Sequence, residues 1–244
     1  MDSTAAILDD AAREYPWLIV HHLHREVRRE PGGENVINRF LTPELWRDCD
    51  AILRIDADIS FRPDFVELLL AEFARNPQLG IASGTLYEYK RGDWSEIRMP
   101  RFHTRGATKI YSVACLEAIG GLSSGLGWDT IDEVKAASLG FITSNFRHIR
   151  AFHHRPQGTA GGILRGRLTA GRAAYQTGYS PLFMVARTCR QALAWPPLIG
   201  SLWLMAGYVE GYVRRLPRTA PPELVRFVRR QQLRRLALMK SIWN

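Results

Sequence analysis

The sequence is poor in cysteine, and the few cysteines that it has are not arranged for structural bonds. Its 244 residues include three of them, Cys49, Cys115 and Cys189. An odd number of widely separated cysteines excludes a disulfide-stabilised scaffold, and without a Cys-x-x-Cys pair a structural zinc site is not expected. A hydrophobic core must therefore hold the chain together, and an apolar content of 46% is sufficient for one.

Several common signatures are also missing from the sequence. It contains no Gly-x-Gly-x-x-Gly loop, no Walker-type loop and no basic-aromatic RNA-binding signature. No nucleic-acid partner is therefore expected. The first residues are acidic and lack a basic stretch followed by an apolar run, so no secretory signal is expected and the cytoplasm is the default compartment.

Acidic side chains are nearly absent from the second half of the chain. Residues 134–244 contain 18 lysines and arginines but two acids, Glu210 and Glu223, whereas residues 1–133 contain 22 acids and 15 bases. Such a basic half suggests an anionic partner, which could be nucleic acid, an acidic membrane surface or a phosphorylated substrate. The alternative is a basic face that is merely solvated.

Apolar runs of strand length alternate with helical patterns in the first two thirds of the chain. Strands are expected at 17–20, 51–55, 141–146 and 151–154 and from residue 80 onward, and helices at 3–14, 35–47, 63–73, 112–119 and 129–139. This alternation predicts an α/β fold with a largely parallel sheet flanked by helices. After residue 156 the pattern is helical and then basic. We therefore predict two regions, a catalytic domain over 1–156 and a basic helical region over 157–244.

Asp56 and Asp58 follow the strand expected at 51–55. In open α/β sheets, ligands bind beyond the carboxyl ends of the strands. Two carboxylates one residue apart at such an edge can bind a hard divalent cation together with a diphosphate. That cation would neutralise charge that develops on a leaving phosphate. The alternative is a pair of turn acids that only cap the next helix.

The segment Ile52–Phe65 resembles the Asp-x-Asp segment of family-2 glycosyltransferases with the GT-A fold. The similarity continues in order through Arg105–Tyr111, Ile119–Leu122, Gly127–Lys135 and Phe152–Pro156, and covers roughly residues 3–185. The resemblance implies a GT-A-like, Rossmann-type sheet and an inverting transfer of a sugar from a nucleotide-sugar donor to a polysaccharide or lipid-linked acceptor. It also implies a divalent cation, Mn²⁺ or Mg²⁺, held by Asp56 and Asp58.

A second acidic cluster follows a glycine-rich segment at the start of an expected helix. Acids suit the positive end of a helix dipole, which can explain one or two of them. The resemblance implies that one aspartate here is the general base that deprotonates the acceptor hydroxyl. Counting back from Gly140 assigns this role to Asp129, with Asp132 as the alternative. Trp128 stands where the family usually has a glutamate.

His153 and His154 follow a short expected strand. Taken alone, histidines at such places are more often structural. The resemblance implies that one of them is a further metal ligand. Consecutive strand residues point in opposite directions, so only one can reach the metal, and we prefer His154. The basic residues Arg105 and Lys109 could contact the diphosphate or the acceptor, or be merely solvated.

The resemblance begins one βα unit into the family pattern. Family members open with a strand that ends in a Pro-x-x-Asn-Glu-like turn, and nothing similar precedes Asp2. The first βα unit, which forms a wall of the nucleotide pocket, is therefore expected to be missing from this sequence. The alternative function is a catalytically inactive GT-A-like remnant that binds a membrane or a protein partner.

Two segments near the C-terminus suggest a membrane surface. Residues 192–213 are apolar over nearly the length of a membrane span, although Pro196, Pro197 and Glu210 argue against a simple spanning helix. Residues 223–239 place apolar and arginine side chains at helical spacing, which suits an anionic bilayer interface. We therefore expect peripheral attachment at the cytoplasmic face of the membrane. The alternative is a helix packed against the catalytic domain.

Overall fold

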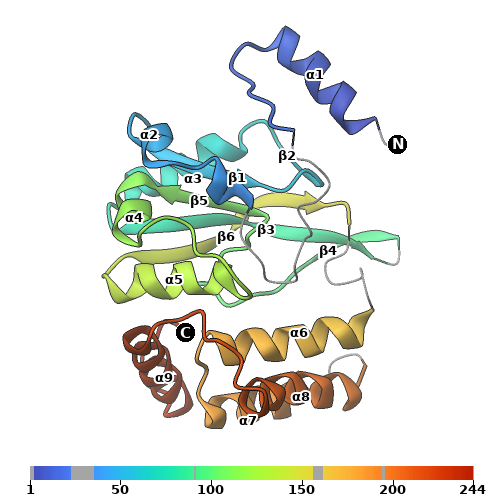
Figure 1. Cartoon of the computed structure of the whole chain (residues 1–244), viewed down its shortest axis with the longest axis vertical. Helices are drawn as coiled ribbons and strands as arrows, with labels where there is room; N and C mark the ends of the chain where they lie inside the picture. Colours follow the sequence, from blue (N-terminus) through green and yellow to red (C-terminus); the bar gives the residue numbers. More distant parts are fainter. Residues whose placement is uncertain (1–2, 23–35, 91, 156–161, 194–195, 244) are drawn as a thin grey trace. The chain divides into compact units, whose positions relative to one another are not determined.

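The computed structural model describes residues 3–22, 36–90, 92–155, 162–193 and 196–243 (Figure 1). The chain divides into two compact units, Met1–Pro31 and Gly32–Asn244. The first unit contains α1 (Thr4–Glu14), which confirms the helix expected at 3–14. Within this unit His22 Nε2 lies 2.7 Å from Asp9 Oδ1 and ties the segment after the helix to the helix itself.

The strand expected at 17–20 is wrong. Trp17 and Ile19 are 77% and 69% exposed, and the segment pairs with no strand in the described part of the chain. A strand forms where a neighbouring strand satisfies its backbone donors and acceptors. Apolar composition alone does not supply that neighbour, so the segment stays an irregular connection.

The second unit is built on one six-stranded sheet with the order β1-β5-β3-β6-β2, and β4 extends from β3. The strands are β1 (Ala51–Ile55), β2 (Ile59–Phe61), β3 (Leu79–Lys90), β4 (Asp93–Glu96), β5 (Thr108–Ser112) and β6 (Ile142–His153). Among these pairings β3 with β6 is parallel and the other four are antiparallel. The sheet is therefore mixed, and the expectation of a largely parallel one is wrong. The α/β fold class is confirmed.

The central strands explain why the alternation of strand and helix patterns wrongly predicted a largely parallel sheet. β3 turns directly into β4 as a hairpin, and a connection this short can join only antiparallel strands. The strands expected at 141–146 and 151–154 are one strand, β6. Its register against β3 shifts between the pairs Gly84–Phe146 and Thr85–Arg150, and this irregularity broke the sequence pattern into two runs.

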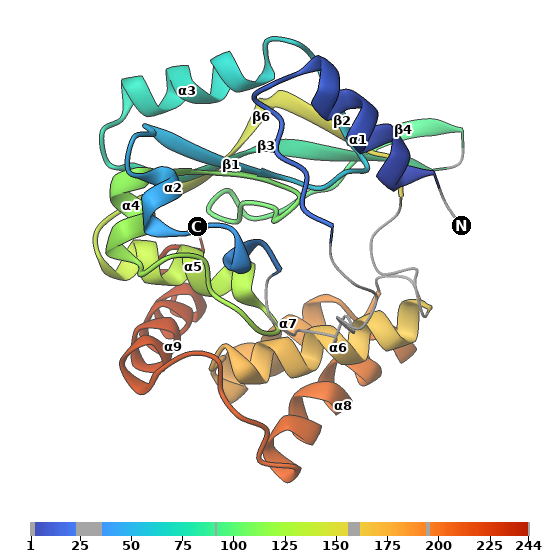
Figure 2. The same ribbon diagram turned by 45° about the horizontal axis from the view of Figure 1, so that its top comes forward.

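Helices cover both faces of the sheet (Figure 2). On one face α3 (Phe65–Arg75) buries Phe65 and Leu69 against β3 and β6. On the other, α4 (Val113–Ala118) and α5 (Trp128–Ser138) pack around Ile81 and Tyr111. The helix expected at 35–47 is two short pieces, η1 (Val36–Arg39) and α2 (Pro43–Trp46). Pro43 disfavours a helical conformation at the residue before it and so ends the first piece.

Four further helices form a layer that joins α5. They are α6 (Ile163–Gln176), α7 (Pro181–Arg190), α8 (Ile199–Val213) and α9 (Pro222–Leu236). Leu224, Val225 and Val228 of α9 lie in one buried cluster with Ile131 and Val134 of α5. These three apolar side chains of α9 are therefore covered by protein, whereas Leu233 on the same helix is 47% exposed. The helix packs against α5, and attachment to a membrane surface stays a prediction.

No helix in the described ranges is long and apolar enough to cross a membrane. Within the second unit, the cluster shared by α5 with α6 to α9 crosses the boundary expected at residue 156. The division of the protein into a catalytic part before that residue and a basic part after it stays a prediction.

The helices α6 and α8 approach each other unusually closely. A Cβ on Gly171 would overlap the Leu204 carbonyl oxygen, and one on Gly207 would overlap the Leu168 carbonyl oxygen. Arg172 adds a bidentate ion pair to Glu210 across the same interface, at 2.8 and 2.9 Å. The absence of side chains at the two glycines is what allows the backbones to come together.

We expect Gly207→Ala to destabilise the protein by about 1–3 kcal/mol, because the methyl group must push the backbone of α6 away. Gly200→Ala on the same helix is the matched control. The atom nearest to its added Cβ would be Pro196 Cδ at 3.3 Å, and the helix gains from alanine's propensity. Urea unfolding measures both. Equal stability of the two variants would show that the α6–α8 interface is not close-packed.

Candidate active site

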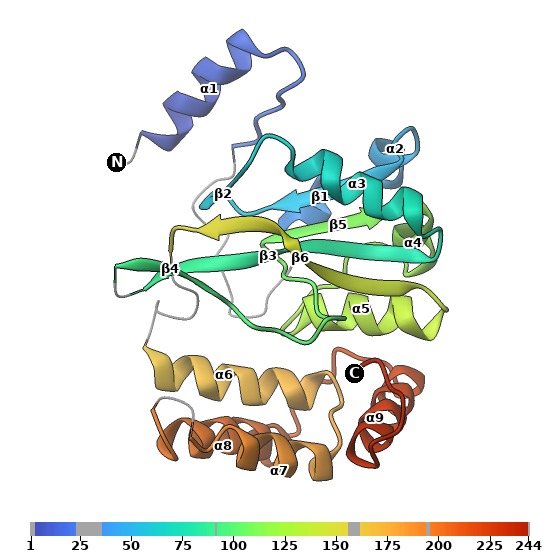
Figure 3. The same ribbon diagram turned by 180° about the vertical axis from the view of Figure 1, so that it is seen from behind.

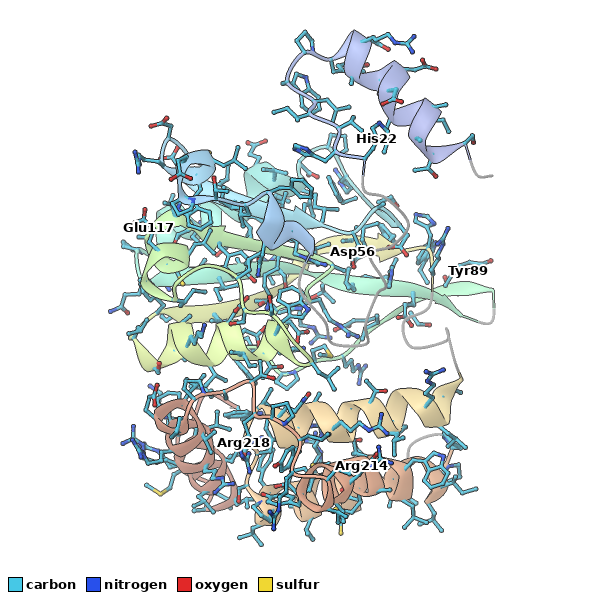
Figure 4. All side chains as sticks on the ribbon, in the orientation of Figure 1. His22, Asp56, Tyr89, Glu117, Arg214 and Arg218 are labelled. Carbon is cyan, nitrogen blue, oxygen red and sulfur yellow. The ribbon has the colours of Figure 1, made fainter. Side chains whose placement is uncertain are left out.

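The Asp-x-Asp turn follows β1 and leads into β2. The Asp56 backbone N–H donates to the Ala107 carbonyl at 3.0 Å, which holds the turn against the segment before β5 (Figure 4). Arg54 Nη2 lies 3.0 Å from Asp56 Oδ1. The Nε and Nη1 atoms of Arg54 are buried and have no hydrogen-bond partner among the described residues. Arg54 therefore positions Asp56 and retains donors for a further group.

Asp58 meets His153, not His154. His153 pairs with Ile59 across β2 and β6, and its Nε2 lies 3.3 Å from Asp58 Oδ1. Its Nδ1 faces Glu88 at 3.9 Å. His154 points the opposite way, and its Nε2 lies 2.8 Å from Ser60 Oγ. Alternation along β6 thus brings His153, and not the preferred His154, to the turn, and the role of either histidine as a metal ligand stays a prediction.

Asp129 lies in the first turn of α5, and a glycine makes that start possible. Gly127 has φ +82°, a left-handed conformation that side chains disfavour, and it precedes Trp128 and Asp129 directly. Asp129 Oδ1 accepts a hydrogen bond from the Thr130 N–H at 2.9 Å, and the residue is partly exposed. Burial lowers the pKa of Arg105, and the nearby Asp129 is the leading charge that opposes this shift.

Trp128 joins the two acidic segments. The Arg54 guanidinium lies 4.8 Å from the centre of the Trp128 ring, and Lys109 Nζ lies 5.4 Å from it. The ring also packs on Gly106, where an added Cβ would be 2.8 Å from Trp128 Cζ2. One contact chain therefore runs from Asp56 through Arg54 and Trp128 to Asp129. Neither Arg54 nor Trp128 was among the expected site residues, although an arginine inside the apolar run 51–55 was a usable signal.

Lys109 is buried and does not reach a ligand site. Its Nζ donates to the Asp129 carbonyl at 2.7 Å and to Glu133 Oε1 at 3.1 Å. Glu133 also lies 2.8 Å from His103 Nδ1 and accepts from the Thr104 N–H at 2.7 Å. Burial alone would raise the pKa of Glu133, but the charges of His103 and Lys109 and these hydrogen bonds together lower it. The idea that Lys109 contacts a diphosphate is therefore wrong.

Asp132 is a structural carboxylate. It is fully buried, and its two oxygens accept from the Tyr111 hydroxyl and the Ser123 N–H, each at 2.9 Å. Burial raises the pKa of Asp132 above its usual range. An acceptor hydroxyl cannot reach a carboxylate enclosed in this way. Of the two candidate bases, Asp129 is the partly exposed one, and its role as the base stays a prediction.

The residues around Asp58 can serve a cation that a diphosphate also binds. Within the described ranges, no group of three or more histidines, cysteines or acids is arranged to hold a metal by itself. Mg²⁺ is commonly held by one or two carboxylates together with substrate phosphates. Asp58 offers a partly exposed carboxylate, and His153 Nε2 lies 3.3 Å from it. A carboxylate of this kind fits such a shared site.

The fold resembles that of a solved glycosyltransferase. The mixed six-stranded sheet flanked by helices is the fold of GT-A-like glycosyltransferases. A similar solved structure is the mannosyltransferase PcManGT from Pyrobaculum calidifontis, described as a complex with GDP-Man and Mn²⁺. The two share 16% sequence identity with a TM-score of 0.51, over 98% of this chain and 69% of the other. No family model and no curated protein matches the sequence, so membership of family 2 stays a prediction.

We expect Lys109→Met to destabilise the protein by about 3–5 kcal/mol, because it leaves Glu133 buried without its cation. Lys135→Met on α5 is the matched control. Lys135 is partly exposed, and its Nζ donates to the Ile119 carbonyl at 3.3 Å. Its loss should cost less than about 1 kcal/mol. Urea unfolding compares the two, and similar midpoints would mean that the Lys109–Glu133 pair does not stabilise the site.

Proposed function

We propose that the protein is a metal-dependent inverting glycosyltransferase that moves a sugar from a nucleotide diphosphate to a hydroxyl of a glycan or lipid-linked acceptor. The observation that carries this proposal is the contact chain from Asp56 through Arg54 and Trp128 to Asp129. This chain of contacts connects the Asp56–Arg54 pair, where a cation and a diphosphate would bind, to the candidate base Asp129. The likeness to a mannosyltransferase crystallised with a nucleotide sugar supports the proposal.

The donor side of the proposed site is the turn at 56–58. Asp58 and Asp56 would hold Mn²⁺ or Mg²⁺, with His153 at 3.3 Å orienting the Asp58 carboxylate. When bound, the cation offsets negative charge on the departing diphosphate. Arg54 lies 3.0 Å from Asp56 and so orients this carboxylate.

The acceptor side is the start of α5. Asp129 would take the proton of the acceptor hydroxyl while its oxygen forms a bond to the anomeric carbon. The bond from that carbon to the diphosphate breaks on the opposite face, so the configuration inverts and the nucleoside diphosphate leaves with the bonding electrons. Gly127 and Trp128 position the Asp129 backbone, and Lys109 holds its carbonyl.

We expect His153→Gln to weaken Mn²⁺-dependent binding of GDP or UDP by about 10–100-fold, and Asp58→Asn to weaken it further. His154→Gln is the matched control, because that side chain contacts Ser60 and faces away from the turn. Isothermal titration calorimetry with each nucleotide, with and without Mn²⁺, measures the effect. If His154→Gln is the more damaging change, the histidine is misassigned. If Asp58→Asn binds as wild type does, the donor site is elsewhere.

We expect Asp129→Asn to lower kcat by about a hundredfold or more and to leave nucleotide affinity unchanged, because a base acts on the acceptor. Glu117→Gln, at an exposed position of α4, should keep wild-type activity (Figure 4). Release of GDP from GDP-mannose, with water or a sugar as acceptor, provides the rate. An Asp129→Asn variant that turns over at the wild-type rate would contradict its role as the base.

A further inference from the structure

The helix α8 is apolar on two opposite sides. One side, with Leu204, Gly207 and Tyr208, is buried against α6 and its neighbours. The other exposes Leu202, Trp203, Val209 and Val213 at helical spacing, with Leu202 and Val209 at 66% and 48% exposure. A helix that is apolar all round is normally covered on every side. The exposed side of α8 therefore lacks its cover in the isolated protein.

The helix α7 extends this apolar surface. Leu182 and Val185, three residues apart on α7, are 60% and 50% exposed. In Figures 1 and 3, α6 lies between the sheet and the helices α7 and α8, so both present an outer side away from the sheet. We call the exposed residues Leu182, Val185, Leu202, Trp203, Val209 and Val213 the α7–α8 face.

Exposed arginines lie at the C-terminal ends of α7 and α8. Arg190 is exposed at the end of α7, and Arg214 and Arg215 are exposed directly after α8. Between Glu133 and Glu223 the sequence has one acid, Glu210. Its carboxylate is paired with Arg172 at 2.8 Å and with Arg214 at 3.1 Å. The surface thus combines an apolar centre with basic ends and no unneutralised acid of its own.

We propose that the α7–α8 face binds an anionic lipid surface. The aliphatic side chains and Trp203 would enter the boundary between headgroups and acyl chains, and the arginines would contact lipid phosphates. A second copy of the chain fits less well. An isologous dimer through this face would bring the basic ends of two copies together, and like charges repel.

This attachment uses part of the apolar segment 192–213 for which the sequence predicts a membrane surface. On the arginine-rich helix α9, Leu224, Val225 and Val228 are buried in the core, and Leu233 is 47% exposed. No residue of the α7–α8 face belongs to the candidate active site. The proposal therefore stands or fails independently of glycosyl transfer.

Vesicle co-sedimentation of the full chain tests the apolar contribution. We expect the double variant Leu202→Gln, Val209→Gln to bind vesicles of phosphatidylcholine with phosphatidylserine at least about tenfold more weakly than wild type. The control, Leu45→Gln with Leu139→Gln, changes two leucines that are each 55% exposed outside this face. It should bind as wild type does. Every substituted position is exposed, so all variants are expected to fold. Thermal unfolding checks that each one does.

The charge contribution is tested separately. Arg190→Gln with Arg215→Gln should weaken binding about tenfold at low salt, and the difference should shrink at high salt. Arg98→Gln with Arg101→Gln, exposed on the sheet side, is the control. Undiminished vesicle binding by the Leu202, Val209 variant would overturn the proposal. Absence of wild-type binding to these vesicles would also overturn it, and light scattering that shows a wild-type dimer, dissociated by that variant, would then assign the face to a second copy of the chain.

Discussion

The contact of the Trp128 ring with two cations is the interaction on which the candidate site depends. Its ring faces Arg54 at 4.8 Å and Lys109 at 5.4 Å, and lies against the backbone at Gly106. Cation–π contacts of this kind are strongest where water is excluded, as it is around the buried Lys109. Because Trp128 precedes Asp129 directly, any shift of the ring moves the candidate base. Because Arg54 also lies beside Asp56, the same shift reaches the turn at Asp56–Asp58.

Two buried acids on α5 serve this arrangement without taking part in the proposed chemistry. Glu133 joins α5 to the loop at His103 and Thr104, and Asp132 joins it to Tyr111 and Ser123. Burial raises the pKa of Asp132, whereas His103 and Lys109 lower that of Glu133. The geometry agrees with this difference, since Glu133 has a cationic partner and Asp132 has two neutral donors. A carboxylate with a charged partner stays ionised in the interior, and its bonds fix the start of the helix.

Sequence patterns predicted the α/β class, the acidic turn and Asp129 as a candidate, because each depends on local order along the chain. They failed where the outcome depends on which segments meet. No strand was expected at 108–112, so β5 and its antiparallel pairing with β1 were missed. Two adjacent histidines look equivalent in sequence, and the register of β6 against β2 decides that His153 faces Asp58. Asp132 and Asp129 are likewise one helical turn apart, and only packing shows that the first is enclosed.

The sequence of the C-terminal helices likewise does not reveal which elements they pack against. Both α8 and α9 carry apolar side chains at helical spacing, and α9 also carries the arginines that favour a membrane reading. Yet α9 covers Ile131 and Val134 of α5, so its apolar side stabilises the helix that bears Asp129. The close approach of α8 to α6 through Gly171 and Gly207 uses one side of α8 and leaves the other outside. The spacing of apolar residues predicts that one side of a helix will be buried, but it does not predict the helix against which that side packs. For α8 that neighbour is α6, because Gly171 and Gly207 let the two backbones approach closely.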